Sequence, residues 1–163
     1  MEIAAGIDSR QGNNNSIYSD TAGVCQLSKL IETRAEFQDL AERRLSEAKV
    51  LLDAGEWSGG YYLAGYAVEL ALKACIIKLL MATDAFPDKE FSKNCYTHSL
   101  EKLVGLAGLT APFAAAWDSN PTLLANWAQT RDWSEEKRYH QVTQLEAETL
   151  YAAISDNTHE VLT

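Results

Sequence analysis

The chain has 163 residues, 47% of them hydrophobic and 23% charged, which is the composition of a globular domain large enough to bury a proper core. Its formal net charge is −9, and so acidic a chain is a poor non-specific binder of nucleic acid or of anionic membranes. The three cysteines, Cys25, Cys75 and Cys95, are odd in number and widely spaced, which argues against a disulfide framework and against zinc. We therefore expect neither a metal nor a cofactor.

The N-terminal part of the sequence differs in composition from the rest. Residues 1–28 are rich in Gly, Ser, Asn and Asp and show no periodicity, so we predict a flexible arm there, or an arm that orders only against a partner. Residues 29–163 are predicted to form a single helical domain. The first residues lack the basic segment and apolar core that mark a signal peptide, and we expect a cytoplasmic protein.

The first clear helical pattern runs over 31–54, where apolar residues recur at spacings of three and four. Gly55 follows as a helix stop. The segment 57–81 is apolar almost all the way round a helical wheel, which is typical of the central helix of a bundle. Its length would be roughly 37 Å at 1.5 Å per residue.

Two charges interrupt the middle of this central segment, Glu69 and Lys73. They leave no uncharged apolar run of about 18 residues, so a membrane span is not expected. At four residues apart they share one helix face, with the acid in the favourable N-terminal position. Gly65 costs about 1 kcal/mol relative to Ala in a helix interior, and this cost predicts that another backbone packs closely there.

The remaining sequence predicts shorter helices and one long loop. Residues 82–96 are polar, contain Pro87 and lack a helical period, so we predict a surface loop. Thr143 and Glu146 fit a capping box that opens the last helix. Helical segments are predicted over 98–109, 110–117, 121–129 and 144–161. The fold class is therefore all-α, an antiparallel bundle of about five helices.

Three stretches of the sequence carry a family resemblance: the string 41–80, the run His98-Ser99-Leu100 and the pair Arg138-Tyr139. Together they resemble the HEPN domain family, small helical proteins whose name proposes nucleotide binding. The string 41–80 resembles the opening helix pair of that family, with the segment Glu-Leu-Ala-Leu-Lys-Ala at 69–74. His98, followed by Ser99 and Leu100, resembles the next landmark, and Arg138-Tyr139 resembles the pair that many members carry before their last helix. The resemblance covers about residues 35–154 and implies an HEPN-like bundle.

The sequence departs from the family's ribonucleases, which carry an Arg and a His separated by four to six residues near the last helix. Arg131 and His140 have eight residues between them, and Arg138 and His140 have one. That chemistry needs the Arg to stabilise charge while the His moves a proton, so both must enter one groove. The chain thus resembles the non-nuclease branch. This resemblance implies small dimeric proteins, often paired with a minimal nucleotidyltransferase in toxin–antitoxin or stress systems.

The polar residues near the centre are the candidate ligand-binding site. We favour a packing role for the Glu69–Lys73 pair, and a buried carboxylate needs partners, for which Arg138 is expected beside Lys73. His98 begins a helix and is expected either to satisfy its free N–H groups or to hydrogen-bond to another helix. The ligand-binding candidates are Glu69, Lys73, His98, Arg138 and Tyr139.

Three tryptophans lie close together in the second half of the sequence. Trp117 and Trp127 are predicted to be core residues. For Trp133, between Asp132 and Ser134, burial in the core and exposure as an interface anchor remain equally open.

These patterns predict a non-catalytic HEPN-like binding or regulatory module. We expect a homodimer, because so apolar a small bundle leaves surface to cover, and a nucleotide, RNA or nucleotidyltransferase as its partner. Two alternatives stay open. One is a degenerate ribonuclease that uses Arg138 and His140 across a dimer groove, and the other is a purely structural helical adaptor.

Overall fold

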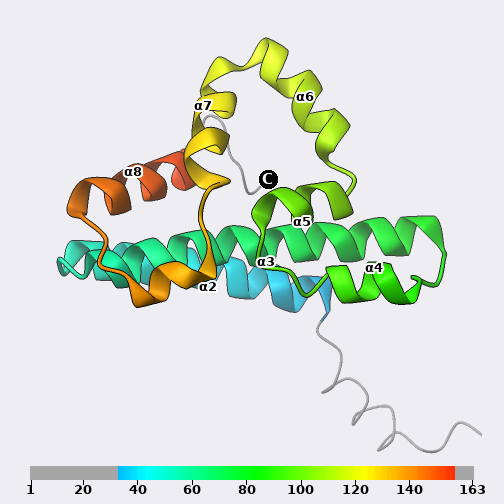
Figure 1. The fold of residues 1–163 in the computed structure, drawn as a ribbon, viewed down its shortest axis with the longest axis horizontal. Coiled ribbons are helices and arrows are strands. Elements are labelled where there is room, and N and C mark those ends of the chain that lie inside the picture. Colours follow the sequence, from blue (N-terminus) through cyan, green and yellow to red (C-terminus); the bar gives the residue numbers. More distant parts are fainter. Residues whose placement is uncertain (1–32, 157–163) are drawn as a thin grey trace, which may run out of the picture. The chain divides into compact units, whose positions relative to one another are not determined.

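A computed structural model describes residues 33–156, and all of these residues belong to one compact unit that begins at Thr33. Within that range the chain contains helices and no strand, which confirms the all-α class (Figure 1). The predicted arm, residues 1–28, lies outside the described residues. The helices are α2 (Arg34–Asp53), α3 (Trp57–Thr83), α4 (Lys89–Asn94), α5 (Leu100–Leu106), α6 (Thr110–Ser119), α7 (Pro121–Thr130), the 3₁₀-helix η1 (Glu135–Tyr139) and α8 (Gln144–Ser155).

The long helices α2 and α3 form an antiparallel pair at the base of the bundle (Figure 1). Gly55 turns the chain between them with φ +80°, a backbone conformation that favours glycine. Their contact is tight at Gly60, where an added Cβ would lie 2.6 Å from the Leu52 side chain and 3.3 Å from the Ala48 carbonyl oxygen. The bundle is therefore built on one close helix pair.

No helix within residues 33–156 combines the length and the apolar character that crossing a bilayer requires.

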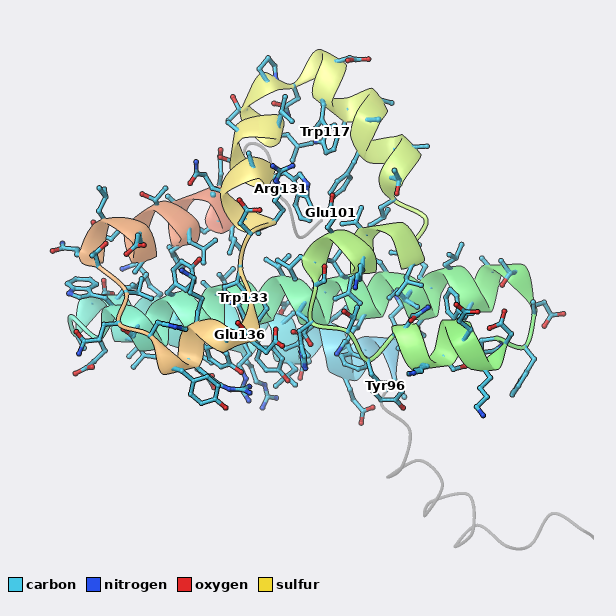
Figure 2. All side chains as sticks on the ribbon, viewed as in Figure 1. Tyr96, Glu101, Trp117, Arg131, Trp133 and Glu136 are labelled. Carbon is cyan, nitrogen blue, oxygen red and sulfur yellow. The ribbon has the colours of Figure 1, made fainter. Side chains whose placement is uncertain are left out.

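Helices α5 and α8 and the 3₁₀-helix η1 pack on α3, and α8 also packs on α2. α6 and α7 form a hairpin in which α7 packs on α8, whereas α6 packs on α7 and stands away from α3 (Figure 1). In that hairpin the Phe113 ring packs against Trp117 and Trp127, with its centroid 6.2 and 5.5 Å from theirs. Trp117 extends from α6 into the space between α6 and α7 (Figure 2). Trp127 is buried as predicted, whereas Trp117 is only half-buried.

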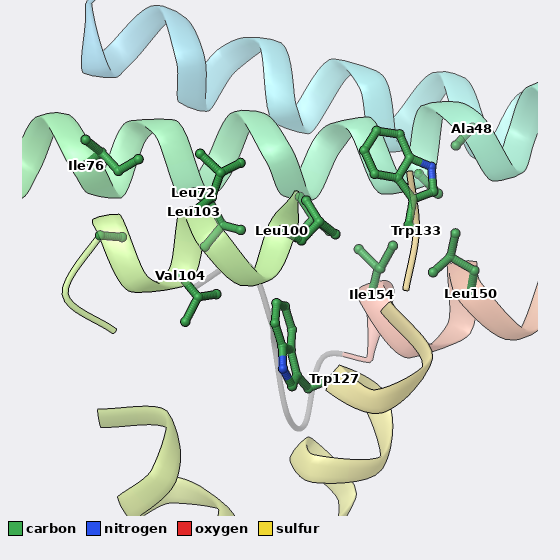
Figure 3. Close-up of a cluster of buried hydrophobic side chains, with 13 residues drawn as sticks. Ala48, Leu72, Ile76, Leu100, Leu103, Val104, Trp127, Trp133, Leu150 and Ile154 are labelled. Carbon is green, nitrogen blue, oxygen red and sulfur yellow. The ribbon is translucent and has the colours of Figure 1, made fainter. Parts of the chain in front are cut away.

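The core gathers between α3, α5, α7 and α8 (Figure 3). Apolar residues at 3–4 spacing on each helix meet there, because an amphipathic helix must bury its apolar stripe against a neighbour. Trp133 belongs to this core at 2% exposure, so its interpretation as an exposed interface anchor is wrong. The largest contributors are Leu72, Ile76, Leu100, Leu103, Trp127, Trp133, Leu150 and Ile154.

Two predicted elements need correction. Residues 82–96 are not all loop, because Asp88 accepts a hydrogen bond from the Phe91 N–H and caps the short helix α4. The last helix ends at Ser155 rather than at 161, with Asp156 in an extended conformation, and residues 157–161 lie outside the described part. The described residues hold seven α-helices, which correspond to the six predicted helical segments and the additional short helix α4.

Capping boxes start two of the helices. Thr33 and Glu36 open α2, and Thr143 and Glu146 open α8, as the sequence predicts for α8. Backbone and side-chain hydrogen bonds from Thr33 lower the pKa of Glu36 below its ordinary value of 4.5. Side-chain and backbone hydrogen bonds from Thr143 lower that of Glu146 in the same way. Both carboxylates accept hydrogen bonds best when ionised.

These boxes predict an acid-sensitive contribution to stability. A carboxyl whose pKa is depressed on folding stabilises the protein above its unfolded-state pKa, and this stabilisation is lost as pH falls through the folded-state pKa. We expect the urea midpoint to fall on acidification below pH 4.5, and to fall less in Glu146→Gln, whose amide oxygen accepts the same bonds without titrating. Equal falls in the variant and the unmutated chain would contradict the assignment.

Candidate functional site

A polar and aromatic stripe runs along one face of α3. Tyr62, Tyr66, Glu69 and Lys73 follow one another at spacings of four, three and four residues, which places all four side chains on the same face. We call these four residues the α3 stripe. The segment that enters α5 meets the stripe at Glu69, and Trp133, just before η1, meets it at Tyr62.

Glu69 is the buried centre of this site. Its side chain is 1% exposed, although it carries a carboxylate. Oε1 accepts a hydrogen bond from Lys73 Nζ at 2.8 Å, and His98 Nδ1 lies 3.1 Å from Oε1 and 3.0 Å from Oε2. A buried charge is tolerated only when it is paired and hydrogen-bonded, so these two partners explain how Glu69 can lie in the core.

The position of His98 is set by the start of α5, which it precedes, and by its contact with Glu69 on α3. Leu100, fully buried, anchors the start of α5, and Ser99 caps that helix by accepting from the Lys102 N–H. The capping role considered for His98 therefore belongs to Ser99, and the predicted hydrogen bond to another helix is confirmed by the contact with Glu69 on α3.

The contact with Glu69 also fixes the proton on the His98 ring. A carboxylate can only accept, so Nδ1 must carry the hydrogen that it donates to Glu69. In the neutral ring Nε2 is then an unprotonated acceptor. The side chain is 45% exposed, and Nε2 lies on the ring edge turned away from the buried carboxylate.

Arg138 is not a partner of Glu69, which corrects the sequence-based prediction. Its guanidinium lies over the Tyr139 ring, 4.7 Å from the centroid, and hydrogen bonding to the Tyr139 and Tyr62 hydroxyls raises the pKa of Arg138. The reason is register. Tyr62 precedes Glu69 by seven residues on α3, which is about two turns or roughly 10 Å.

Tyr66 connects the two ends of the stripe. Its ring stacks on Tyr62 with centroids 6.1 Å apart and an interplanar angle of 18°. Burial, followed by the negative charge of Glu69, raises the pKa of Tyr66, so its hydroxyl stays protonated at neutral pH. The site therefore has a cationic, aromatic end at Arg138 and a polar end at His98.

Trp133, just before η1, packs closely against Gly65 on α3, a contact that the sequence indicated only in part. An added Cβ at Gly65 would lie 2.3 Å from the Trp133 ring, so the glycine leaves the notch that the indole fills. Gly65 did signal a close approach, but the approaching group is an indole ring and not a backbone. The Trp133 ring also packs against the Tyr62 ring, with centroids 5.9 Å apart, and its Nε1 has no hydrogen-bond partner among the described residues.

Arg138 and His140, the alternative catalytic pair, have separate partners. His140 Nδ1 lies 3.0 Å from the Glu136 carbonyl oxygen, to which it must donate, and the ring is exposed. Arg138 turns instead toward Tyr139 and Tyr62. Over residues 33–156, no group of three or more His, Cys, Asp or Glu side chains is placed to hold a metal ion.

The helix pair α2–α3 is the part of the chain that matches a known protein family. The HEPN domain model matches residues 36–86. The match spans α2 and α3 and so confirms the resemblance over the two helices that carry the α3 stripe. His98 and Arg138 lie outside the matched range. Neither the search of curated proteins nor the search of solved structures found a match.

Proposed function

We propose that this HEPN-like chain is a non-catalytic binding module whose ligand is an elongated nucleotide lying along the α3 stripe. The observation that carries the proposal is the arrangement of the stripe itself. A cation backed by aromatic rings stands at one end, and a half-exposed histidine oriented by a buried acid stands at the other. An anionic ligand with a hydroxyl-bearing portion matches both ends.

The cationic end is suited to phosphate because its charge is not neutralised by a neighbour. Within residues 33–156, Arg138 forms no ion pair with a carboxylate, whereas Arg43, Arg44, Lys49 and Lys73 each do. The Arg138 guanidinium lies over the face of the Tyr139 ring. Arginine presents several N–H donors in a planar fork that matches phosphate oxygens.

The binding role is favoured over ribonuclease activity because the arginine and the histidine that cleavage would need each contact other groups within residues 33–156. General acid–base cleavage of RNA requires a proton carrier and a charge stabiliser at one phosphate. The side chain of His140 is bound to its own turn, and that of Arg138 faces α3. Nuclease activity that the unmutated chain shows and that His140→Ala lacks would favour the ribonuclease alternative instead.

We further propose a homodimer, because so apolar a small bundle leaves surface to cover, and a minimal nucleotidyltransferase as a second protein partner, on the strength of the HEPN resemblance. Size-exclusion chromatography with light scattering tests the first. Co-purification with a nucleotidyltransferase encoded beside this chain tests the second.

Calorimetric titration with ATP tests the binding role. We expect ATP to bind, and Arg138→Gln to weaken binding about tenfold or more, because a charge-assisted hydrogen bond contributes about 1.5–3 kcal/mol. Arg43→Gln is the matched control, since Arg43 is an exposed cation on α2 that is paired with Asp39. Silence with ATP, AMP and short RNA alike would contradict the proposal and leave the structural adaptor.

A further inference from the structure

The polar end of the α3 stripe is electrically balanced, which separates its chemistry from that of the Arg138 end. Glu69 carries one negative charge and Lys73 one positive charge, and their contact is 2.8 Å. The His98 ring adds no charge in its neutral form. With His98 in that form the cluster has no surplus positive charge, so it is poorly suited to a phosphate and better suited to a neutral polar group.

The His98 ring presents an acceptor to that group. Nδ1–H is committed to the Glu69 carboxylate at 3.0 Å, and Glu69 is 1% exposed, so the ring cannot reverse its protonation without leaving a buried carboxylate short of a donor. Nε2 has no hydrogen-bond partner among residues 33–156. Lys73 Nζ bonds the same Oε1 and so lies close to the ring.

We propose that His98 Nε2 accepts a hydrogen bond from a ribose hydroxyl of the bound nucleotide, and that Glu69 is the positioning residue that makes this nitrogen an acceptor. The proposal rests on the nucleotide-binding function above. It adds a discrimination that the phosphate end cannot supply. The phosphates occupy the Arg138 end, roughly 10 Å along α3, and the sugar lies at the His98 end.

The discrimination follows from the fixed tautomer. A hydroxyl can donate to Nε2, whereas a ligand without sugar hydroxyls leaves Nε2 facing no donor. A site that hydrogen-bonds a hydroxyl therefore rejects the analogue that lacks it. We expect ATP to bind about tenfold more tightly than 2′,3′-dideoxy-ATP.

Two variants separate this role from a packing role. His98→Asn keeps an amide N–H at the position of Nδ1, so Glu69 remains paired, but it removes Nε2. We expect its urea midpoint to stay near that of the unmutated chain, while its preference for ATP over 2′,3′-dideoxy-ATP falls to about onefold. Glu69→Gln offers an amide that can donate to Nδ1, which permits the opposite tautomer and should also abolish the preference.

The experiment measures both nucleotides by calorimetry on the full-length chain and on both variants, together with long-range ¹H–¹⁵N spectra of the imidazoles. The expected result is a preference in the unmutated chain alone and a neutral His98 with an unprotonated Nε2. Equal binding of the two nucleotides to the unmutated chain, or a protonated Nε2 in its neutral ring, overturns this proposal and leaves the binding function standing. Failure of both nucleotides to bind overturns both.

Discussion

Replacing Gly65 by alanine is expected to lower the free energy of unfolding by about 2–3 kcal/mol, because overpacking a filled core forces neighbours to move. The new Cβ would lie 2.3 Å from the Trp133 ring, and Trp133 is 2% exposed with no solvent side to retreat to. Displacement of the indole would carry η1 with it. Urea denaturation followed by circular dichroism measures the loss.

Two further variants make the Gly65 prediction specific. Gly105→Ala in α5 is the control, because an added Cβ there meets nothing within 4 Å, and it should be neutral or stabilise by up to about 1 kcal/mol. Trp133→Ala alone should cost about 3–5 kcal/mol. In that background Gly65→Ala should cost nothing, since the clash is gone. Additive losses in the double variant would show that the indole does not occupy the notch.

Replacing Lys73 by methionine is expected to cost about 3 kcal/mol, because it leaves the buried Glu69 carboxylate without its ammonium partner. The double variant Glu69→Leu/Lys73→Met should recover most of this loss, since an apolar pair of similar volume is often as stable as a buried ion pair. Thermal or urea unfolding of the three proteins provides the measurement.

An exposed ion pair supplies the control for the Lys73 prediction. Arg43 and Asp39 stand four residues apart on α2 with a contact of 3.1 Å, but both side chains are about 70% exposed. Arg43→Met should therefore change stability by no more than about 0.5 kcal/mol. If Lys73→Met were equally mild, Glu69 would not depend on its ion pair, and the buried site would need another explanation.

Local patterns in the sequence predicted what depends on neighbouring residues. The central helix begins at Trp57 as predicted, and the Thr143–Glu146 box opens α8 as predicted. The Glu69–Lys73 pair forms at the expected spacing. Each of these features is set within one or two turns of helix, where periodicity and capping chemistry are informative.

Contacts between distant segments could not be predicted in the same way. The burial of Trp133 depends on a notch at Gly65, far away in the sequence, and nothing in the charged segment around Trp133 signals it. The register between η1 and α3 places Arg138 at Tyr62 instead of Glu69. A helix face can be read from one sequence, but the height at which a second element crosses it depends on the packed core.

Nucleotide binding along the α3 stripe is tested most directly by an amide and imidazole chemical-shift titration of ¹⁵N-labelled protein with ATP. We expect the largest changes to fall on Arg138 and Tyr139 at one end of the α3 stripe and on Lys73 and His98 at the other, with α6 unaffected. Changes confined to α6 and α7, or none along α3, would contradict it.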